Sequence, residues 1–219
     1  MASKSKILIV DDHPMIREGL AQLIAKEKDL GVCGEAEDAH QALEAISKLK
    51  PDLILVDITL PNKSGLELIK DIEVLYPKIK LLVISMHDES LYAERALRAG
   101  ARGYIMKQEG GKKIMEAIRH VLGGEIYVSP KMSSKLLQIF SGKGKRNQDS
   151  PLEKLTDREF EIFQLIGQGL STQEIAQKLH LSVKTIEVHR NNAKQKLELK
   201  SAAELLRYSV RWIEAQNPS

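Results

Sequence analysis

The feature that most constrains the fold is a strict alternation of short aliphatic runs and amphipathic segments through the first 125 residues. The runs have the length and branching of strands, and the segments between them repeat apolar residues with helical periodicity. The expected strands are 6–10, 31–36, 53–56, 81–84 and 103–106, and the expected helices are 14–26, 39–49, 65–75, 90–99 and 111–122. This alternation predicts a doubly wound α/β domain with a five-stranded parallel sheet covered on both faces, binding ligands at the carboxyl ends of its strands.

Beyond Leu152 the pattern changes to helices alone. Capping boxes, in which a hydroxyl and a carboxylate each satisfy a free backbone N–H at a helix start, begin at Thr156, Ser171 and Ser201. Ser182 can cap a fourth helix. The expected helices are about 157–167, 172–179, 183–197 and 202–215. They predict a second domain that is all-α.

A polar, glycine-containing stretch at 141–150 separates the two patterns and is typical of a flexible linker. We predict a first domain at 1–125, a linker at 126–151 that includes a short helix over 132–140, and a second domain at 152–219. Residues 1–130 contain 18 Lys and Arg against 20 Asp and Glu, whereas residues 131–219 contain 15 against 10. The excess of positive charge makes the C-terminal part the candidate for binding a polyanion such as DNA.

The cysteine content and the short N-terminal apolar run indicate the cellular compartment of the protein. The single cysteine, Cys33, forms no intramolecular disulfide, has no zinc-ligand neighbours, and is expected to be a small buried apolar residue. The apolar run at 7–10 is too short for a signal peptide or a membrane span. We expect a cytoplasmic protein with no membrane partner.

Polar side chains end four of the five expected strands. Asp11 and Asp12 follow the first strand and Asp57 follows the third, and a doubly wound sheet brings these carboxylates to one edge. Like charges so close are costly unless a cation intervenes, and oxygen ligands suit Mg²⁺. Ser85 and Lys107 end the fourth and fifth strands, where a hydroxyl and a cation can bind phosphoryl oxygens. The set indicates phosphoryl transfer to a carboxylate, with formation of an acyl phosphate.

Residues 5–125 resemble the receiver domain of two-component response regulators. The matching stretches are Asp11-Asp12, Asp57-Ile-Thr-Leu-Pro61, Gly65, Ser85 and Gly103-Tyr-Ile-Met-Lys107. The resemblance implies a flavodoxin-like fold in which Asp57 accepts a phosphoryl group from a sensor histidine kinase. It also implies that Asp12, Asp57 and the backbone carbonyl of Thr59 bind Mg²⁺, with Asp11 acting through water.

The same resemblance assigns a signalling role to three further residues. Lys107 would pair with the phosphoryl group, Ser85 would swing toward it, and Tyr104 would rotate inward as the switch. Two residues depart from the family pattern: Leu60 stands where methionine is frequent, and Gln108 where many receivers have proline. Gln108 bears on how the loop before the fifth helix moves, and neither departure affects the chemistry.

The helices at 172–179 and 183–197 are joined by a turn short enough for a helix-turn-helix unit. On a helical projection of the second helix, Ile186, Ala193 and Leu197 share a buried side, with Val183 nearby. The opposite side suits a major groove of double-stranded DNA. The candidate DNA contacts are Lys184, Thr185, Glu187, Val188, Arg190, Asn191 and Lys194.

These candidates divide by chemistry. Asn191 can pair with adenine, Val188 can meet a thymine methyl group, and Glu187 can accept from cytosine or repel phosphate at wrong sites. The other four are suited to phosphate, which supplies affinity without sequence information. An ordinary solvated face stays open as the alternative for any single one of them.

Residues 152–215 resemble the LuxR/NarL-type DNA-binding domain. The matching stretches are Leu155-Thr-Asp-Arg-Glu159, Gly169-Leu-Ser-Thr-Gln-Glu-Ile-Ala176, Leu181-Ser-Val-Lys-Thr-Ile-Glu-Val-His-Arg190 and Lys196-Leu197. The resemblance identifies the chain as a response regulator of the NarL/FixJ type and implies a homodimer when phosphorylated, with the last helix as the usual dimerisation surface. Trp212 on that helix is core or interface, and we favour the core.

Three other classes of protein share part of these features. A haloacid-dehalogenase-type phosphohydrolase needs a second acid two residues after the nucleophile, where this chain has Thr59. An acyl-homoserine-lactone sensor, which shares the DNA-binding domain, needs an aromatic-lined apolar pocket, whereas this chain has the carboxylate cluster instead. A receiver regulated without phosphate stays open. We expect a regulator rather than an enzyme: phosphorylation of Asp57 controls dimerisation, promoter binding and transcription, and its own chemistry is limited to weak Mg²⁺-dependent self-phosphorylation and dephosphorylation.

Overall fold

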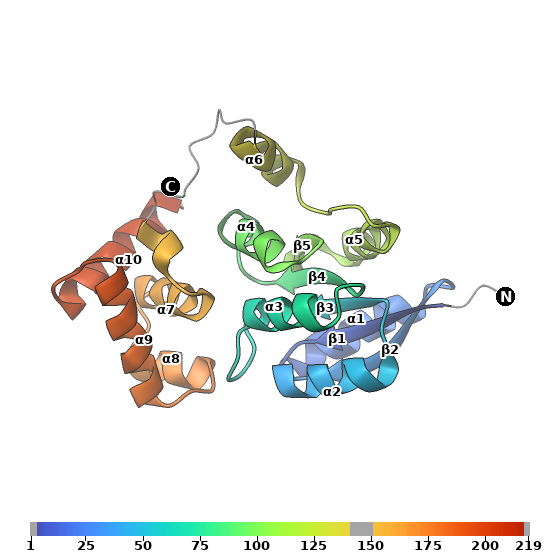
Figure 1. Cartoon of the computed structure of the whole chain (residues 1–219), viewed down its shortest axis with the longest axis horizontal. Coiled ribbons are helices and arrows are strands. Elements are labelled where there is room, and N and C mark those ends of the chain that lie inside the picture. Colours follow the sequence, from blue (N-terminus) through green and yellow to red (C-terminus); the bar gives the residue numbers. More distant parts are fainter. Residues whose placement is uncertain (1–3, 141–150, 217–219) are drawn as a thin grey trace. The chain divides into compact units, whose positions relative to one another are not determined.

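A computed structural model describes residues 4–140 and 151–216, so the expected linker at 141–150 lies outside the described residues. The chain divides into two compact units, residues 1–144 and 145–219 (Figure 1). The first unit contains β1 Ser5–Val10, α1 Pro14–Ala25, β2 Leu30–Ala36, α2 Ala39–Leu49, β3 Leu53–Val56, α3 Gly65–Leu75, β4 Lys80–Ser85, α4 Glu89–Ala99, β5 Gly103–Met106, α5 Gly111–Gly123 and α6 Pro130–Phe140. The second contains α7 Asp157–Gly167, α8 Thr172–Lys178, α9 Val183–Lys196 and α10 Ala202–Gln216.

The five strands form one parallel sheet in the order β2-β1-β3-β4-β5, which confirms the predicted doubly wound, flavodoxin-like class. The strand order reverses between β1 and β3, and a crevice opens at the carboxyl ends of the strands at such a point. Val10 and Val56 are register partners at the ends of these two strands. The residues that follow them, Asp11 and Asp57, are therefore brought side by side.

Both faces of the sheet are buried. Ile7, Ile9 and Leu55 pack with α1 and α5 in one core cluster, while Leu8 and Val10 alternate to the opposite face and are equally inaccessible. Such burial on both faces explains why the strand sequences are nearly continuous apolar runs. Cys33 is a correction to the sequence prediction: it is half-buried rather than buried, because β2 lies at the edge of the sheet.

The start of α3 is pressed against the end of β3. The Gly65 N–H donates to the Ile58 carbonyl at 2.7 Å, and a Cβ at Gly65 would lie 1.8 Å from the Asp57 carbonyl oxygen. Ser64 caps this helix in a reciprocal box with Glu67, which the sequence analysis did not predict. The absent side chain of Gly65 thus lets helix and strand approach closely beside Asp57.

In the second unit α7 packs against α10 through aromatic rings. The Trp212 ring lies 5.6 Å from Phe160 and 5.8 Å from Phe163, centroid to centroid, and Tyr208 lies 5.6 Å from Phe163. These edge-on contacts pack one side of the Trp212 ring against α7, but the side chain is only half-buried, so the choice between core and interface stays open.

The predicted helix caps are confirmed with one change. The boxes at Thr156 and Ser171 are complete, and Ser182 accepts from the Thr185 N–H at 3.0 Å. Ser201 accepts from the Glu204 N–H, but the Glu204 carboxylate accepts from the Lys200 N–H, one residue before the predicted position. None of the helices in the described ranges combines the length and apolar character that a membrane crossing requires.

We expect Gly65→Ala to destabilise the first unit by about 3 kcal/mol or more, because the new Cβ overlaps a backbone oxygen that cannot move without distorting the end of β3. The control is Gly19→Ala in α1, where a Cβ meets nothing within 4 Å and should stabilise by about 0.5–1 kcal/mol. Hydrogen exchange of the sheet amides is the measurement, since the single tryptophan lies in the second unit. Equal stabilities of the two variants would contradict the close-approach explanation.

Candidate functional site

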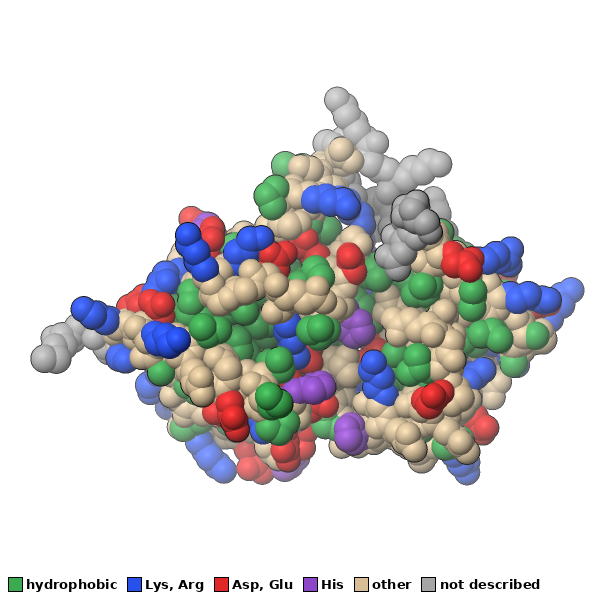
Figure 2. All heavy atoms as spheres, turned by 180° about the vertical axis from the view of Figure 1, so that it is seen from behind, with side chains coloured by type: hydrophobic (Ala, Val, Ile, Leu, Met, Phe, Trp, Pro, Cys, Tyr) green, Lys and Arg blue, Asp and Glu red, His purple; other side chains and the backbone are tan. Residues whose placement is uncertain are grey.

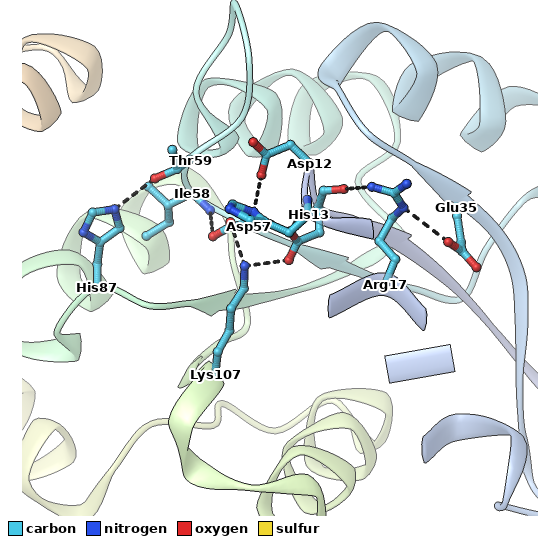
Figure 3. Close-up of polar contacts among 10 residues, drawn as sticks. Asp12, His13, Arg17, Glu35, Asp57, Ile58, Thr59, His87 and Lys107 are labelled. Carbon is cyan, nitrogen blue, oxygen red and sulfur yellow. Dashed lines mark hydrogen bonds and ion pairs between the residues drawn. The ribbon is translucent and has the colours of Figure 1, made fainter. Parts of the chain in front are cut away.

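One lysine joins two carboxylates at the carboxyl edge of the sheet (Figure 3). Lys107 Nζ lies 2.6 Å from Asp11 Oδ2 and 2.8 Å from Asp57 Oδ2, and all three side chains are at most 5% exposed. The second oxygen of Asp57, Oδ1, accepts from the Ile58 N–H at 2.7 Å. Three residues that are far apart in the sequence thus meet in a buried crevice, as their places at the strand ends predicted.

The electrostatics of Asp57 are dominated by burial, which raises its pKa to about 6, and Asp11 adds to the rise. The Lys107 charge opposes the rise. Burial also disfavours the charged Lys107, but the two carboxylates outweigh it, so the pKa of Lys107 is above its ordinary value. At neutral pH Asp57 is therefore mainly ionised and Lys107 is a fixed cation.

Asp12 and His13 complete the acidic edge. A ligand atom from each of Asp11, Asp12, His13 and Asp57 can be chosen so that all lie within 4.8 Å of one another. Asp11 Oδ2 and Asp12 Oδ1 are buried, and each has a neighbour within ion-pair distance, Lys107 Nζ at 2.6 Å and His13 Nδ1 at 2.6 Å, respectively. The cluster can hold a metal ion, because carboxylate oxygens that lie this close together are the ligands that a hard cation prefers.

The two predicted switch residues, Ser85 and Tyr104, both form hydrogen bonds with the backbone of His87. The Tyr104 hydroxyl, buried inside the domain, donates to the His87 carbonyl at 2.9 Å, and the His87 N–H donates to Ser85 Oγ at 3.2 Å. The His87 ring lies 2.9 Å, Nε2 to Oγ1, from the hydroxyl of Thr59 (Figure 3). Burial raises the pKa of Tyr104 above its ordinary value, so its hydroxyl stays protonated and can donate.

Sequence reasoning missed four residues of this site. His13 Nδ1 lies 2.6 Å from Asp12 Oδ1, and Arg17 Nη1 donates to the Asp11 carbonyl at 2.7 Å while its Nε lies 3.3 Å from Glu35 (Figure 3). His13 directly follows the acidic pair, and Arg17 lies one helical turn farther on. This closeness in the sequence could have placed both residues at the site. Glu35 and His87 gave none, because their roles depend on pairing between strands.

The outward face of α9 is exposed in the second unit. Val188 is 51% exposed, as a methyl contact requires, but Val183 is 42% exposed, which corrects its expected place near the buried side. Ile186, Ala193 and Leu197 are buried as predicted. Val183 is outside the core because it begins the helix, one turn before the packed stripe. Over the face of the molecule that Figure 2 draws, Lys and Arg side chains are interspersed with Asp and Glu.

Some candidate DNA contacts already have protein partners. Arg190 Nη1 donates to Thr172 Oγ1 at 2.6 Å and joins α9 to α8, and Lys194 Nζ donates to Asn191 Oδ1 at 3.3 Å. The Thr185 hydroxyl bonds to Ser182 at the helix start. A pocket of about 300 Å³ lies on this side, lined among others by Arg190, Asn191 and Lys194. Lys184 and Glu187 are exposed.

Comparison with known families agrees with both halves of this geometry. Residues 7–119 match the response regulator receiver domain, and residues 153–209 match the bacterial regulatory proteins of the luxR family. The chain is a two-component response regulator with a LuxR-type DNA-binding domain.

Relatives match this response regulator over nearly its whole length. The oxygen regulatory protein NreC of Staphylococcus carnosus strain TM300 is 36% identical over 210 residues, which are 94% of this chain and 97% of that protein. NreC of Staphylococcus aureus strain bovine RF122 / ET3-1 is 37% identical with the same coverage.

Among solved structures, RcsB of Salmonella typhimurium has a TM-score of 0.66 and 26% identity, covering 96% of this chain and 98% of that one. RcsB of Salmonella enterica serovar Typhimurium, solved bound to a promoter in the presence of the phosphomimetic BeF3⁻, has a TM-score of 0.63 and 27% identity. That comparison covers 94% of this regulator and 98% of RcsB.

The pKa of Asp57 makes a prediction about stability. An unfolded aspartate has a pKa of about 3.9, so a folded pKa of about 6 means that the buried charge costs about 3 kcal/mol above pH 6 and nothing below about pH 4. We expect Asp57→Asn to stabilise the first unit by about that amount at pH 7 in metal-free buffer, and to give no gain at pH 4. Hydrogen exchange of the sheet amides at both pH values is the measurement. A gain that is the same at both pH values would rule out this electrostatic origin.

Proposed function

We propose that Asp57 is the phospho-acceptor through which a sensor histidine kinase controls this regulator. The observation that supports it most is the position of the Asp57 carboxylate, held between the Ile58 N–H and Lys107 at the switch point of the sheet. In the transfer, a carboxylate oxygen attacks phosphorus, a P–O bond forms, and the P–N bond to the kinase histidine breaks. A small phosphodonor such as acetyl phosphate would react in the same way, which is the weak self-phosphorylation expected here.

The residues around the acceptor have complementary tasks. Lys107 neutralises charge on the transferring group from a fixed position and requires no reorganisation. Asp11, Asp12, Asp57 and the Thr59 backbone carbonyl would hold Mg²⁺, and the closeness of the three carboxylates, with ligand atoms within 4.8 Å of one another, supports this. The bound cation would supply charge neutralisation to the carboxylates and the phosphoryl oxygens.

Ser85 and Tyr104 would then change position in response to the phosphoryl group. The Ser85 hydroxyl accepts from the His87 N–H, and turning toward the phosphoryl group would release that N–H. Tyr104 donates to the carbonyl of the same residue, so both side chains act on the loop before α4. Phosphorylation would shift the population of this loop rather than create a new state.

The second unit would carry the output to DNA. We assign Asn191, Val188 and Glu187 to base edges, and Lys184, Thr185, Arg190 and Lys194 to phosphates. Arg190 can serve both Thr172 and a phosphate, because a guanidinium has five donors. RcsB forms dimers on DNA in its solved complex, which supports a phosphorylation-dependent homodimer on double-stranded promoter DNA here.

The proposal also assigns the domain boundaries and the cellular compartment of the protein. Phosphorylation would reside in a receiver at 1–125, DNA binding at 152–219, and the connection at 126–151. A regulator that reads chromosomal promoters acts in the cytoplasm. Its role is regulatory rather than enzymatic, and the acyl phosphate chemistry at Asp57 is its only expected reaction.

Incubation of the full chain with Mg²⁺ and acetyl phosphate tests the acceptor. We expect intact mass to show one added phosphate in the wild type and none in Asp57→Ala. Asp52→Ala, which removes a carboxylate at the opposite end of β3, is the control and should accept phosphate normally. An adduct of equal size in Asp57→Ala, or none in the wild type with any donor, would refute the assignment.

Binding to cognate and random DNA tests the reading face. We expect Asn191→Ala to weaken cognate binding by roughly tenfold or more while changing random binding little, because a bidentate base contact discriminates by about 1–3 kcal/mol. Lys194→Ala should weaken both alike and reduce the salt slope by about 1. Fluorescence anisotropy over a salt series measures both. Equal losses on the two DNAs for Asn191→Ala would reject its base-reading role.

A further inference from the structure

The switch residue Tyr104 is also bonded through its backbone to a segment beyond the sheet. The Tyr104 N–H donates to the Tyr127 carbonyl at 2.8 Å, and the Tyr127 N–H donates to the Arg102 carbonyl at 3.0 Å. Tyr127 thus forms a parallel bridge with Gly103 along the open edge of β5. The Tyr127 ring also packs edge-on against His120 of α5, with centroids 5.6 Å apart.

The sequence of β5 permits this approach. A Cβ at Gly103 would lie 2.8 Å from the Tyr127 carbonyl oxygen, a separation that real Cβ atoms essentially never show. A side chain at this position would push the segment off the strand. Gly103 is therefore a second, independent sign that the edge of β5 is built to receive the chain that leaves α5.

A few residues later the same segment is held by the first turn of α4. The Ser129 N–H donates to Glu89 Oε1 at 2.7 Å, and Ser129 Oγ accepts from the Met132 N–H at the start of α6. Met132 is only 2% exposed, and Lys135 Nζ donates to the Ser90 carbonyl at 3.2 Å. The helix α6 is thus docked on α4, which it contacts within the first unit.

Both anchors lie beside the residues that are assigned to the switch. Tyr104 bonds to the docked segment with its backbone and to the His87 carbonyl with its hydroxyl. Glu89 begins α4 only two residues after His87. We propose that residues 126–140 are a docked output segment, whose seat on Glu89 and on the edge of β5 transmits the state of Ser85 and Tyr104 to the DNA-binding unit. This inference rests on the proposed phosphorylation of Asp57.

Ser85, His87 and Glu89 lie within five consecutive residues, from the end of β4 to the start of α4. A turn of Ser85 toward a phosphoryl group removes the acceptor of the His87 N–H, and the loop that positions Glu89 must rearrange. The Ser129 N–H would then lose a charge-assisted partner at the start of α6. Because α6 is the last described helix before the second unit, a change in its docking alters how that unit is tethered.

Hydrogen exchange of the full chain tests this proposal, with Mg²⁺ and beryllofluoride as the phosphoryl analogue. We expect the amides of residues 126–138 to exchange at least threefold faster in Glu89→Ala than in the wild type, before any analogue is added. Glu89→Gln should restore most of the protection, because an amide oxygen still accepts from the Ser129 N–H. Glu94→Ala is the control on the same helix, since Glu94 pairs with Arg98.

The analogue provides the second readout. In the wild type we expect beryllofluoride to change exchange in 126–138 at least threefold, and in Glu89→Ala to leave it within twofold. The ratio of promoter affinities with and without phosphate should fall at least fivefold in Glu89→Ala, while the rate of phosphorylation at Asp57 is unchanged.

The outcomes separate the two proposals. Exchange in unmodified Glu89→Ala equal to that in Glu94→Ala would overturn the docking. Unchanged exchange in wild-type protein that carries the analogue would overturn the transmission. Failure of Asp57 to take phosphate or beryllofluoride counts against the acceptor role and removes transmission with it, while the docking is still decided by Glu89→Ala without analogue.

Discussion

The ion pairs of Lys107 with Asp11 and Asp57 are the interaction on which the receiver depends. Two carboxylates in a buried crevice repel each other, and burial penalises the charged form of each. A single buried ammonium lying between them offsets part of both effects and fixes the end of β5 relative to the ends of β1 and β3. The close approach at Gly65 and the bond from the Tyr104 hydroxyl to the His87 carbonyl lie at the same edge of the sheet.

Much of this arrangement was predictable because it follows from patterns of short range. Apolar runs gave the strands, capping residues gave the helix starts, and polar residues at strand ends gave Asp11, Asp57 and Lys107. The family resemblance supplied the roles of Ser85 and Tyr104. The edge strand β2 also formed where expected, beginning one residue earlier, at Leu30.

What the sequence did not predict depends on contacts between distant elements. The Tyr104 hydroxyl reaches the His87 carbonyl because β4 and β5 are neighbours in register, so this contact has no local signal. Cys33 is half-buried because its strand has one partner, and Val183 is exposed because a helix start projects past the packed stripe. The bridge of Tyr127 to β5 gave no periodic signal either, since it is a single residue long.

The pairing of Tyr127 has a consequence for where the receiver can be cut. In a fragment that ends at residue 125, the Tyr104 N–H and the Arg102 carbonyl would lose their partners, and β5 would become a bare edge of the sheet. Bare edges template pairing with other chains, so such a fragment would be prone to self-association. A fragment that ends after α6 keeps the edge covered and buries Met132. The compact limit of the folded receiver therefore extends past the last helix of its sheet, into chain that connects it to the DNA-binding unit.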